Sequence, residues 1–298
     1  MPTMKNILVA LGSADEARYV LRKAAALATA NHARLHAVRV VHEGVADIGT
    51  SAIDASAELK SFILASAETE LEEWLTPARR HVPDLDSVTL WNARTWEGLL
   101  HAAEQAAADL IIRAVSTHHK FGDVVRTPDD WNLLRHAPVP VMLVKPQPWV
   151  DDPIVVCALD PFDDAHQNLN VALLQESQGF ASVLRGELVV VVAYPLFEPW
   201  VGQLGATGSY EEIRQSIDSD IRDRVDALAR QAGVRFKHLI VEEGHATEVI
   251  GRVVEDTVAE LLVIGTHGRN GVQGLLLGNT AERILHVVGT DVVTVRGG

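Results

Sequence analysis

A chain of 298 residues, of which 47% are hydrophobic and 22% charged, is long enough to form two soluble globular domains. Its 40 acidic residues outnumber its 26 Lys and Arg residues, and the formal net charge of −14 argues against nucleic acid as a partner, because Lys and Arg make most phosphate contacts. The sequence has neither an apolar run of about 18 residues nor the basic start of a leader peptide, so we expect a cytoplasmic protein that does not enter a membrane.

Apolar runs that alternate with helical periodicity predict an α/β fold. In the first half, the apolar run at 5–13 leads into a helical pattern and then into a second strand at 35–41. The run at 189–192 is continuously apolar, as in a sheet covered by helices on both faces. In the second half we expect strands near 153–159, 187–193, 235–241, 260–264 and 290–296, and helices near 164–182, 210–232, 246–258 and 279–288. The single cysteine, Cys157, excludes an intramolecular disulfide and is expected to be a packed core thiol.

The two halves of the chain are repeats of one another. Residues 108–145 align without a gap with residues 259–296, each residue matching the one 151 positions later. Residues 145–153, with three prolines and two aspartates, have the composition of a linker. We therefore predict two tandem Rossmann-like domains, at 1–148 and 152–298, each a five-stranded parallel sheet with helices on both faces.

A glycine-rich segment after the fourth expected strand of the second half is the main candidate for a functional site. Gly265, Gly268 and Gly278 have the spacing G-x2-G-x9-G, and a helix is expected to begin at Asn279. Glycines let backbone N–H groups approach an anion closely. The helix N-terminus, which Asn279 or Thr280 can cap, favours phosphate. The segment therefore predicts a site for the phosphates of a nucleotide.

Two side chains within the same segment, His267 and Arg269, add hydrogen-bond donors, and Arg269 can pair with phosphate oxygens. A glycine-rich turn that only connects the strand to the helix is the alternative interpretation, and it stays open at this point.

With this motif at the end of its fourth strand, the chain resembles the universal stress protein family. The resemblance covers essentially the whole chain, and the stretch TPDDWNLLRHAPVPVMLVKPQPW at 127–149 looks characteristic of the tandem, E-type members. It implies a stress-response regulator that binds ATP or a related nucleotide in its C-terminal domain. In ATP-binding members an Asp after strand one, a residue at the end of strand two and the glycine motif hold the nucleotide. Carried over to this chain, these positions are Asp160, Ala193, Gly265, Gly268, Gly278, Asn279 and Thr280.

Two of these positions need comment. The Asp160 carboxylate can accept hydrogen bonds from adenine or ribose groups, and a simple helix cap is its alternative role. Asn279 departs from the family pattern, since nucleotide-binding members more often have Ser or Thr there.

The first half lacks the motif. The alignment puts Ala114, Thr117 and Thr127 at the three glycine positions, and Pro128 at the position of Asn279, where it removes an N–H donor. Gly12 stands near the place of Asp160, and two aspartates follow Pro128. We expect that this half does not bind a nucleotide in the manner of the family.

Other patterns leave alternatives open. His118 and His119 could recruit zinc only with a further ligand, so we assign no metal site. Enzyme signatures such as a Walker A loop are missing, so we assign no catalytic residue and expect at most slow ATP hydrolysis. A scaffold or carrier for an apolar ligand or zinc is the alternative function. The β-branched final strands at 139–144 and 291–296 leave a homodimer open.

Overall fold

The computed structural model describes residues 4–43, 53–115, 128–195, 210–266 and 278–296. The chain divides into two compact units between Trp149 and Val150. This boundary lies inside the segment 145–153 that the sequence marks as a linker.

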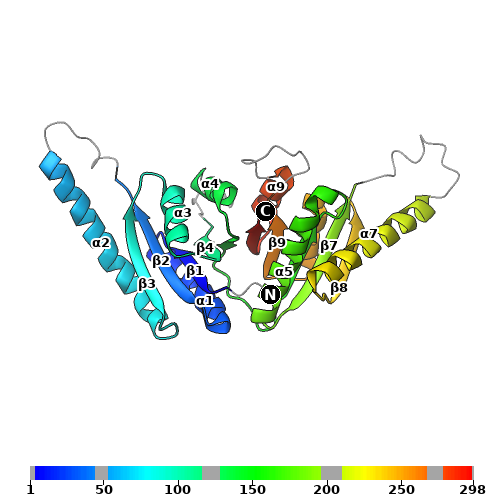
Figure 1. The fold of residues 1–298 in the computed structure, drawn as a ribbon, viewed down its shortest axis with the longest axis horizontal. Helices are drawn as coiled ribbons and strands as arrows, with labels where there is room; N and C mark the ends of the chain where they lie inside the picture. The colour runs from blue at the N-terminus through cyan, green and yellow to red at the C-terminus, as the bar shows by residue number, and fades with distance from the viewer. Residues whose placement is uncertain (1–3, 44–52, 116–127, 196–209, 267–277, 297–298) are drawn as a thin grey trace. The chain divides into compact units, whose positions relative to one another are not determined.

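The N-terminal unit alternates strands and helices (Figure 1). In chain order its elements are β1 (Asn6–Ala10), α1 (Ala14–Asn31), β2 (Arg34–Val41), α2 (Ile53–Arg79), β3 (Leu85–Trp91), α3 (Thr95–Gln105), β4 (Leu110–Ala114), α4 (Pro128–His136) and β5 (Val141–Val144). The strands lie in the order β3-β2-β1-β4-β5, and neighbouring strands are parallel.

The C-terminal unit repeats this arrangement. Its elements are β6 (Ile154–Leu159), a short 3-10 helix η2 (Asp164–His166), α5 (Gln167–Val183), β7 (Glu187–Tyr194), α7 (Tyr210–Ala232), β8 (His238–Glu243), α8 (Ala246–Asp256), β9 (Leu261–Gly265), α9 (Asn279–Val287) and β10 (Asp291–Val295). The order β10-β9-β6-β7-β8 is again parallel throughout. The predicted fold class, two Rossmann-like domains with parallel sheets, is confirmed.

Helices cover both faces of the sheet, as two successive residues of β2 show. Arg39 Nη1 donates to the carbonyl of Ala67 in α2 at 2.9 Å. The next side chain, Val40, lies against Gly98 of α3, where a Cβ would come within 3.0 Å of it. Since successive side chains of a strand point to opposite faces, α2 and α3 pack on opposite sides of the sheet.

The core of the C-terminal unit follows the apolar runs in the sequence. Residues 189–192 of β7 are at most 3% exposed, and the Phe180 ring of α5 is fully buried. Cys157 is fully buried in β6, and this burial raises the pKa of its thiol to about 12. The interpretation of Cys157 as a packed core thiol is therefore confirmed.

Two expected elements begin or divide differently from the prediction. The strand expected at 235–241 runs from His238 to Glu243, because the chain joins the ladder of β7 only at the pair of Val189 and His238. The helix expected at 164–182 is divided into η2 and α5. Asp163 caps the first of these, its Oδ1 accepting a hydrogen bond from the Ala165 N–H at 2.9 Å.

Residues 145–149 are part of the N-terminal unit rather than of a free linker. The ammonium group of Lys23 in α1, only 3% exposed, donates to the carbonyl of Lys145 at 2.9 Å. The same ammonium lies 5.3 Å from the centre of the Trp149 ring. Arg22 donates to the carbonyl of Pro146 at 3.4 Å. The first residues of the predicted linker are thus fixed to α1 by a buried cation.

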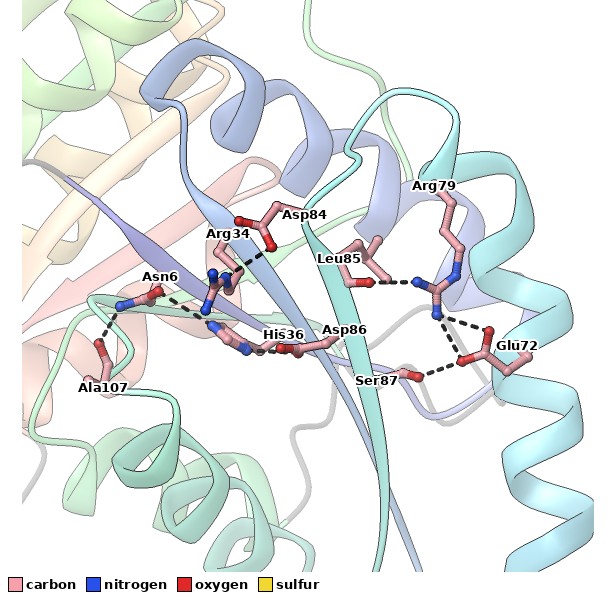
Figure 2. Close-up of polar contacts among 10 residues, drawn as sticks. All are labelled: Asn6, Arg34, His36, Glu72, Arg79, Asp84, Leu85, Asp86, Ser87 and Ala107. Carbon is pink, nitrogen blue, oxygen red and sulfur yellow. Dashed lines mark hydrogen bonds and ion pairs between the residues drawn. The ribbon is translucent and has the colours of Figure 1, made fainter.

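Polar contacts hold the edge strand β3 to α2 (Figure 2). The Ser87 hydroxyl donates to the Glu72 carboxylate, and Arg79 Nη2 lies 2.9 Å from both oxygens of the same group. Arg79 Nη1 also donates to the carbonyl of Leu85. Together, the Ser87 hydroxyl first and then Arg79 hold the pKa of Glu72 below its ordinary value of 4.5.

The other face of β3 carries charged pairs with β2 (Figure 2). His36 Nδ1 lies 2.8 Å from Asp86 Oδ1, and Arg34 Nε lies 3.0 Å from Asp84 Oδ1. His36 Nε2 also reaches Asn6 Oδ1 of β1, at 3.5 Å. Charged side chains of this kind disfavour the addition of a further strand at a sheet edge.

The lowered pKa of Glu72 predicts a pH-dependent contribution to stability. The stabilising contacts need the carboxylate, so their contribution is present above the ordinary pKa and is lost as the pH falls through the lowered pKa of the folded state. Glu72→Gln should therefore reduce the free energy of unfolding at about pH 7 by at most about 1 kcal/mol, because the groups are half-exposed. In urea unfolding experiments, the difference from the wild type should shrink as the pH is lowered below 4.5, the ordinary pKa of the carboxyl group. An undiminished difference at the lower pH would show that the contacts act without the charge.

Candidate functional site

Three predicted site residues lie at the carboxyl edge of the sheet in the C-terminal unit. Asp160 directly follows β6, Ala193 is the last but one residue of β7, and Gly265 ends β9. β6 is the parallel neighbour of both β7 and β9, so the three residues meet at one edge. All three are partly exposed. Ligands of open parallel sheets bind at this edge.

The main chain and the carboxylate of Asp160 are both held in place. Asn170 Nδ2 donates to the Asp160 carbonyl at 2.7 Å, and Asn170 Oδ1 accepts from the Asp160 N–H at 3.2 Å. Asp160 Oδ1 accepts from the Phe162 N–H at 3.4 Å, and Oδ2 lies 3.7 Å from His166 Nδ1. The cap of the following helix is Asp163, not Asp160. The alternative role for Asp160, a simple helix cap, is therefore not what the structure shows.

Gly265 is needed for packing whatever else it does. A Cβ at this position would lie 2.9 Å from Leu169 Cδ2 of α5, which is closer than real Cβ contacts. The glycine thus lets α5 pack directly on the end of β9. It also leaves backbone without a side chain at the carboxyl edge, so the structural and the binding roles are compatible.

The start of α9 differs from the expected cap. Gly278 is the N-cap, and its N–H donates to the carbonyl of Thr266 at 3.0 Å. Asn279 and Thr280 are the first two residues of the helix rather than its cap. Because a glycine cap has no side chain, it cannot accept from the first N–H groups of the helix. His267, Gly268 and Arg269 lie outside the described residues.

Two tyrosines and a glutamate link the other side of this edge. The Tyr210 hydroxyl, at the start of α7, donates to the Glu243 carboxylate at the end of β8. Tyr194, which follows Ala193 in β7, is 3% exposed. Burial, and then the charge of Glu243, raise the pKa of the Tyr194 hydroxyl, so it stays protonated. The contact between Tyr210 and Glu243 ties the beginning of α7 to the end of β8.

In the N-terminal unit the carboxylate of Glu16 accepts a hydrogen bond from the loop after β1. The pairings of β1 with β4 and of β6 with β9 place Gly12 at the position of Asp160. The Gly12 N–H donates to Glu16 Oε2 at 3.2 Å, and the Glu16 N–H donates to the hydroxyl of the cap Ser13 at 3.4 Å. This reciprocal arrangement resembles a capping box, and it uses a backbone donor at the carboxyl edge.

A buried ion pair lies between the end of β4 and the start of α4, the helix that corresponds to α9. Arg113 Nε of β4 lies 3.0 Å from Asp130 Oδ1, in the first turn of α4. The Asp130 side chain is 1% exposed and that of Arg113 15%. At the corresponding positions of the C-terminal unit, 151 residues later, stand Ile264 and Ala281. The N-terminal unit thus has a buried carboxylate in the first turn of α4, at a position where the C-terminal unit has Ala281.

The sequence analysis did not find three residues that shape these edges: His166, Asn170 and Arg113. Asn170 occupies a buried position on the apolar side of α5, with Leu173 and Leu174 following it, and a polar residue in such a pattern is a detectable signal. Arg113 interrupts an apolar strand and could be found in the same way. His166 gives no comparable signal, because it lies in a polar segment.

Metal and membrane signals are missing from the part of the chain that the structure describes. There, no group of three or more His, Cys, Asp and Glu side chains is placed to hold a metal ion. His118 and His119 lie outside it. Within the same described ranges, no helix has the length and hydrophobicity needed to cross a bilayer.

Comparisons with known proteins agree with this geometry. The model of the universal stress protein family matches residues 3–145 and again residues 154–296. Universal stress protein E of Photorhabdus laumondii is 26% identical, over 99% of this chain and 96% of that protein. The Escherichia coli K12 protein of the same name is 31% identical over 215 residues, which are 70% of this chain and 66% of that protein. A functionally unknown protein from Pseudomonas aeruginosa shares the fold, with a TM-score of 0.71 and 24% identity over 99% of this chain and 93% of its own.

The two family matches fall on the two units of the structure, one on each side of the boundary after Trp149. The chain therefore belongs to the universal stress protein family of stress-response proteins, as a tandem-domain member of the E type.

Proposed function

We propose that this protein is a cytoplasmic stress-response regulator that binds ATP or a related nucleotide in its C-terminal unit. The observation that carries the proposal is the difference between the two units at the same edge. In the N-terminal unit, Glu16 accepts from the loop after β1, and Asp130 pairs with Arg113 beside α4. In the C-terminal unit the corresponding helix begins at Gly278, without a side-chain cap.

The nucleotide would span this edge of the C-terminal unit. The glycine motif of Gly265, Gly268 and Gly278 would leave space for the phosphates at the start of α9. The backbone N–H groups of the first turn of that helix, with the donors of His267, Gly268 and Arg269, would hold them. The Asp160 carboxylate would accept hydrogen bonds from adenine or ribose hydroxyls, beside the backbone of Ala193. The 35% exposure of the Asp160 side chain leaves room for such contacts.

The proposal assigns binding rather than catalysis. We place no general base against the phosphates, so hydrolysis would be slow and nucleotide binding would act as a signal. The bound nucleotide would stabilise one state of the C-terminal unit, and a partner protein would then recognise that state.

Titration calorimetry with ATP tests the proposal. Gly268→Val adds a branched side chain to the phosphate loop and should weaken ATP binding at least about 100-fold, since backbone donors can then no longer surround the anion. The repeat provides a matched control: Thr117→Val changes the corresponding residue of the N-terminal unit, 151 positions earlier, and should leave the affinity unchanged.

Failure of the wild type to bind ATP, ADP and AMP would contradict the proposal and favour the alternative function. Native mass spectrometry of the purified protein would then separate the remaining cases. A co-purifying apolar ligand or zinc ion, in place of a nucleotide, would identify a carrier, and a bare chain mass would favour a scaffold.

A further inference from the structure

Asn170 is a buried polar residue whose side-chain amide bonds the main chain of Asp160. It is 2% exposed, and both ends of its amide bond the main chain of Asp160. The left-handed residues His32 and Arg185 that follow α1 and α5 align the two helices. This alignment puts the buried Ala17 at the position of Asn170. The N-terminal unit therefore lacks the buried amide as well as the carboxylate that it holds.

Both oxygens of the Asp160 carboxylate have contacts within the protein. The Phe162 N–H bonds Oδ1, and the His166 imidazole faces Oδ2 from the 3-10 helix. The His166 side chain is 12% exposed, and its main-chain N–H donates to the carbonyl of Asp163 at 2.9 Å, so the backbone that carries the ring is fixed and the ring itself is mostly buried. A carboxylate held in this way has little freedom to rotate away from a ligand.

We infer that His166 is a positioning residue of the nucleotide site: it orients the Asp160 carboxylate toward the hydrogen-bond donors of the nucleoside. This inference rests on the proposed function and adds a residue to the site. A carboxylate oxygen has two lone pairs, so Oδ2 can face the His166 imidazole at 3.7 Å and still accept from a ligand. Asn170 fixes the main chain of Asp160, and His166 fixes the direction of the Asp160 side chain.

A residue that acts through another one is tested by a double-mutant cycle. ATP affinities are measured by calorimetry on the full chain for the wild type, His166→Ala, Asp160→Ala and the double variant. Asp160→Ala should weaken binding by at least about 10-fold, as expected for the loss of hydrogen bonds to a charged group. His166→Ala should weaken it by about 3-fold to 10-fold, and should add nothing once Asp160 has been replaced.

A conservative variant and a distant histidine complete the experiment. His166→Gln, whose amide can donate to Oδ2, should retain most of the affinity that His166→Ala loses. His238→Ala, at the exposed amino end of β8, should bind ATP like the wild type. Circular dichroism of each variant checks that it is folded.

The outcomes separate this inference from the proposed function. If the wild type binds ATP and His166→Ala binds it equally well, the inference is overturned while the function stands. Additive losses in the double variant would also overturn it, because they would show that His166 acts independently of Asp160. If the wild type does not bind ATP, the proposed function fails and the positioning role fails with it.

Discussion

Replacing Asp130 with alanine is expected to lower the free energy of unfolding of the N-terminal unit by about 3–5 kcal/mol. The Asp130 carboxylate is 1% exposed and lies 3.0 Å from Arg113 Nε, whose side chain is itself 15% exposed. The variant keeps the guanidinium in its buried place without the opposite charge. The penalty for removing that cation from water is then no longer offset.

Urea unfolding followed by tryptophan fluorescence suits this measurement, because five of the six Trp residues precede residue 150. The C-terminal unit supplies the control. Arg113→Ile combined with Asp130→Ala copies Ile264 and Ala281, which are 3% and 5% exposed at the same places. This double variant should recover most of the lost stability, since apolar replacement of a buried ion pair is often neutral. Equal instability of the single and double variants would instead assign the loss to packing.

The fold could be predicted from the sequence because its signal is repeated. Continuous apolar strands such as residues 189–192 are buried on both faces, and the same order of strand, loop and helix occurs in both halves. The boundaries that differed depend on contacts between distant residues. The first residues of the predicted linker are fixed by the side chain of Lys23, more than a hundred positions earlier, and local composition does not contain that contact.

The candidate site was predictable only where local spacing carries the information. Asp160, Ala193 and Gly265 lie at or next to the carboxyl ends of strands, so parallel topology alone brings them to one edge. The cap of α9 was misplaced, because Asn279 has the better capping side chain but Gly278 takes the cap position. His166 and Asn170 act on Asp160 through folded geometry. The sequence pattern can mark Asn170 as a polar residue on an apolar helix face, but only the structure shows that its partner is Asp160.

The second large loss of stability is expected on replacing Phe180, a core residue of α5, the helix that also contacts the candidate site. The ring is fully buried in α5, the same helix whose first turns hold Leu169 against Gly265 and Asn170 against Asp160. Phe180→Ala should lower the free energy of unfolding of the C-terminal unit by about 3–5 kcal/mol, from lost burial and the cavity that remains. Phe180→Leu copies Leu27, the corresponding residue of α1, and should cost less than about 1.5 kcal/mol.

ATP should offset part of the Phe180→Ala loss if α5 supports the nucleotide site. A ligand at about 100 times its dissociation constant stabilises the state that binds it by about 2.7 kcal/mol. Amide hydrogen exchange, read separately for the two units, should therefore show that ATP restores protection to the C-terminal unit of Phe180→Ala. The N-terminal unit of Asp130→Ala should gain none, because Glu16 still accepts from the Gly12 N–H there and Ala114, Thr117 and Thr127 stand in place of the motif glycines. Equal protection of both units by ATP would contradict the asymmetry on which the proposed function depends.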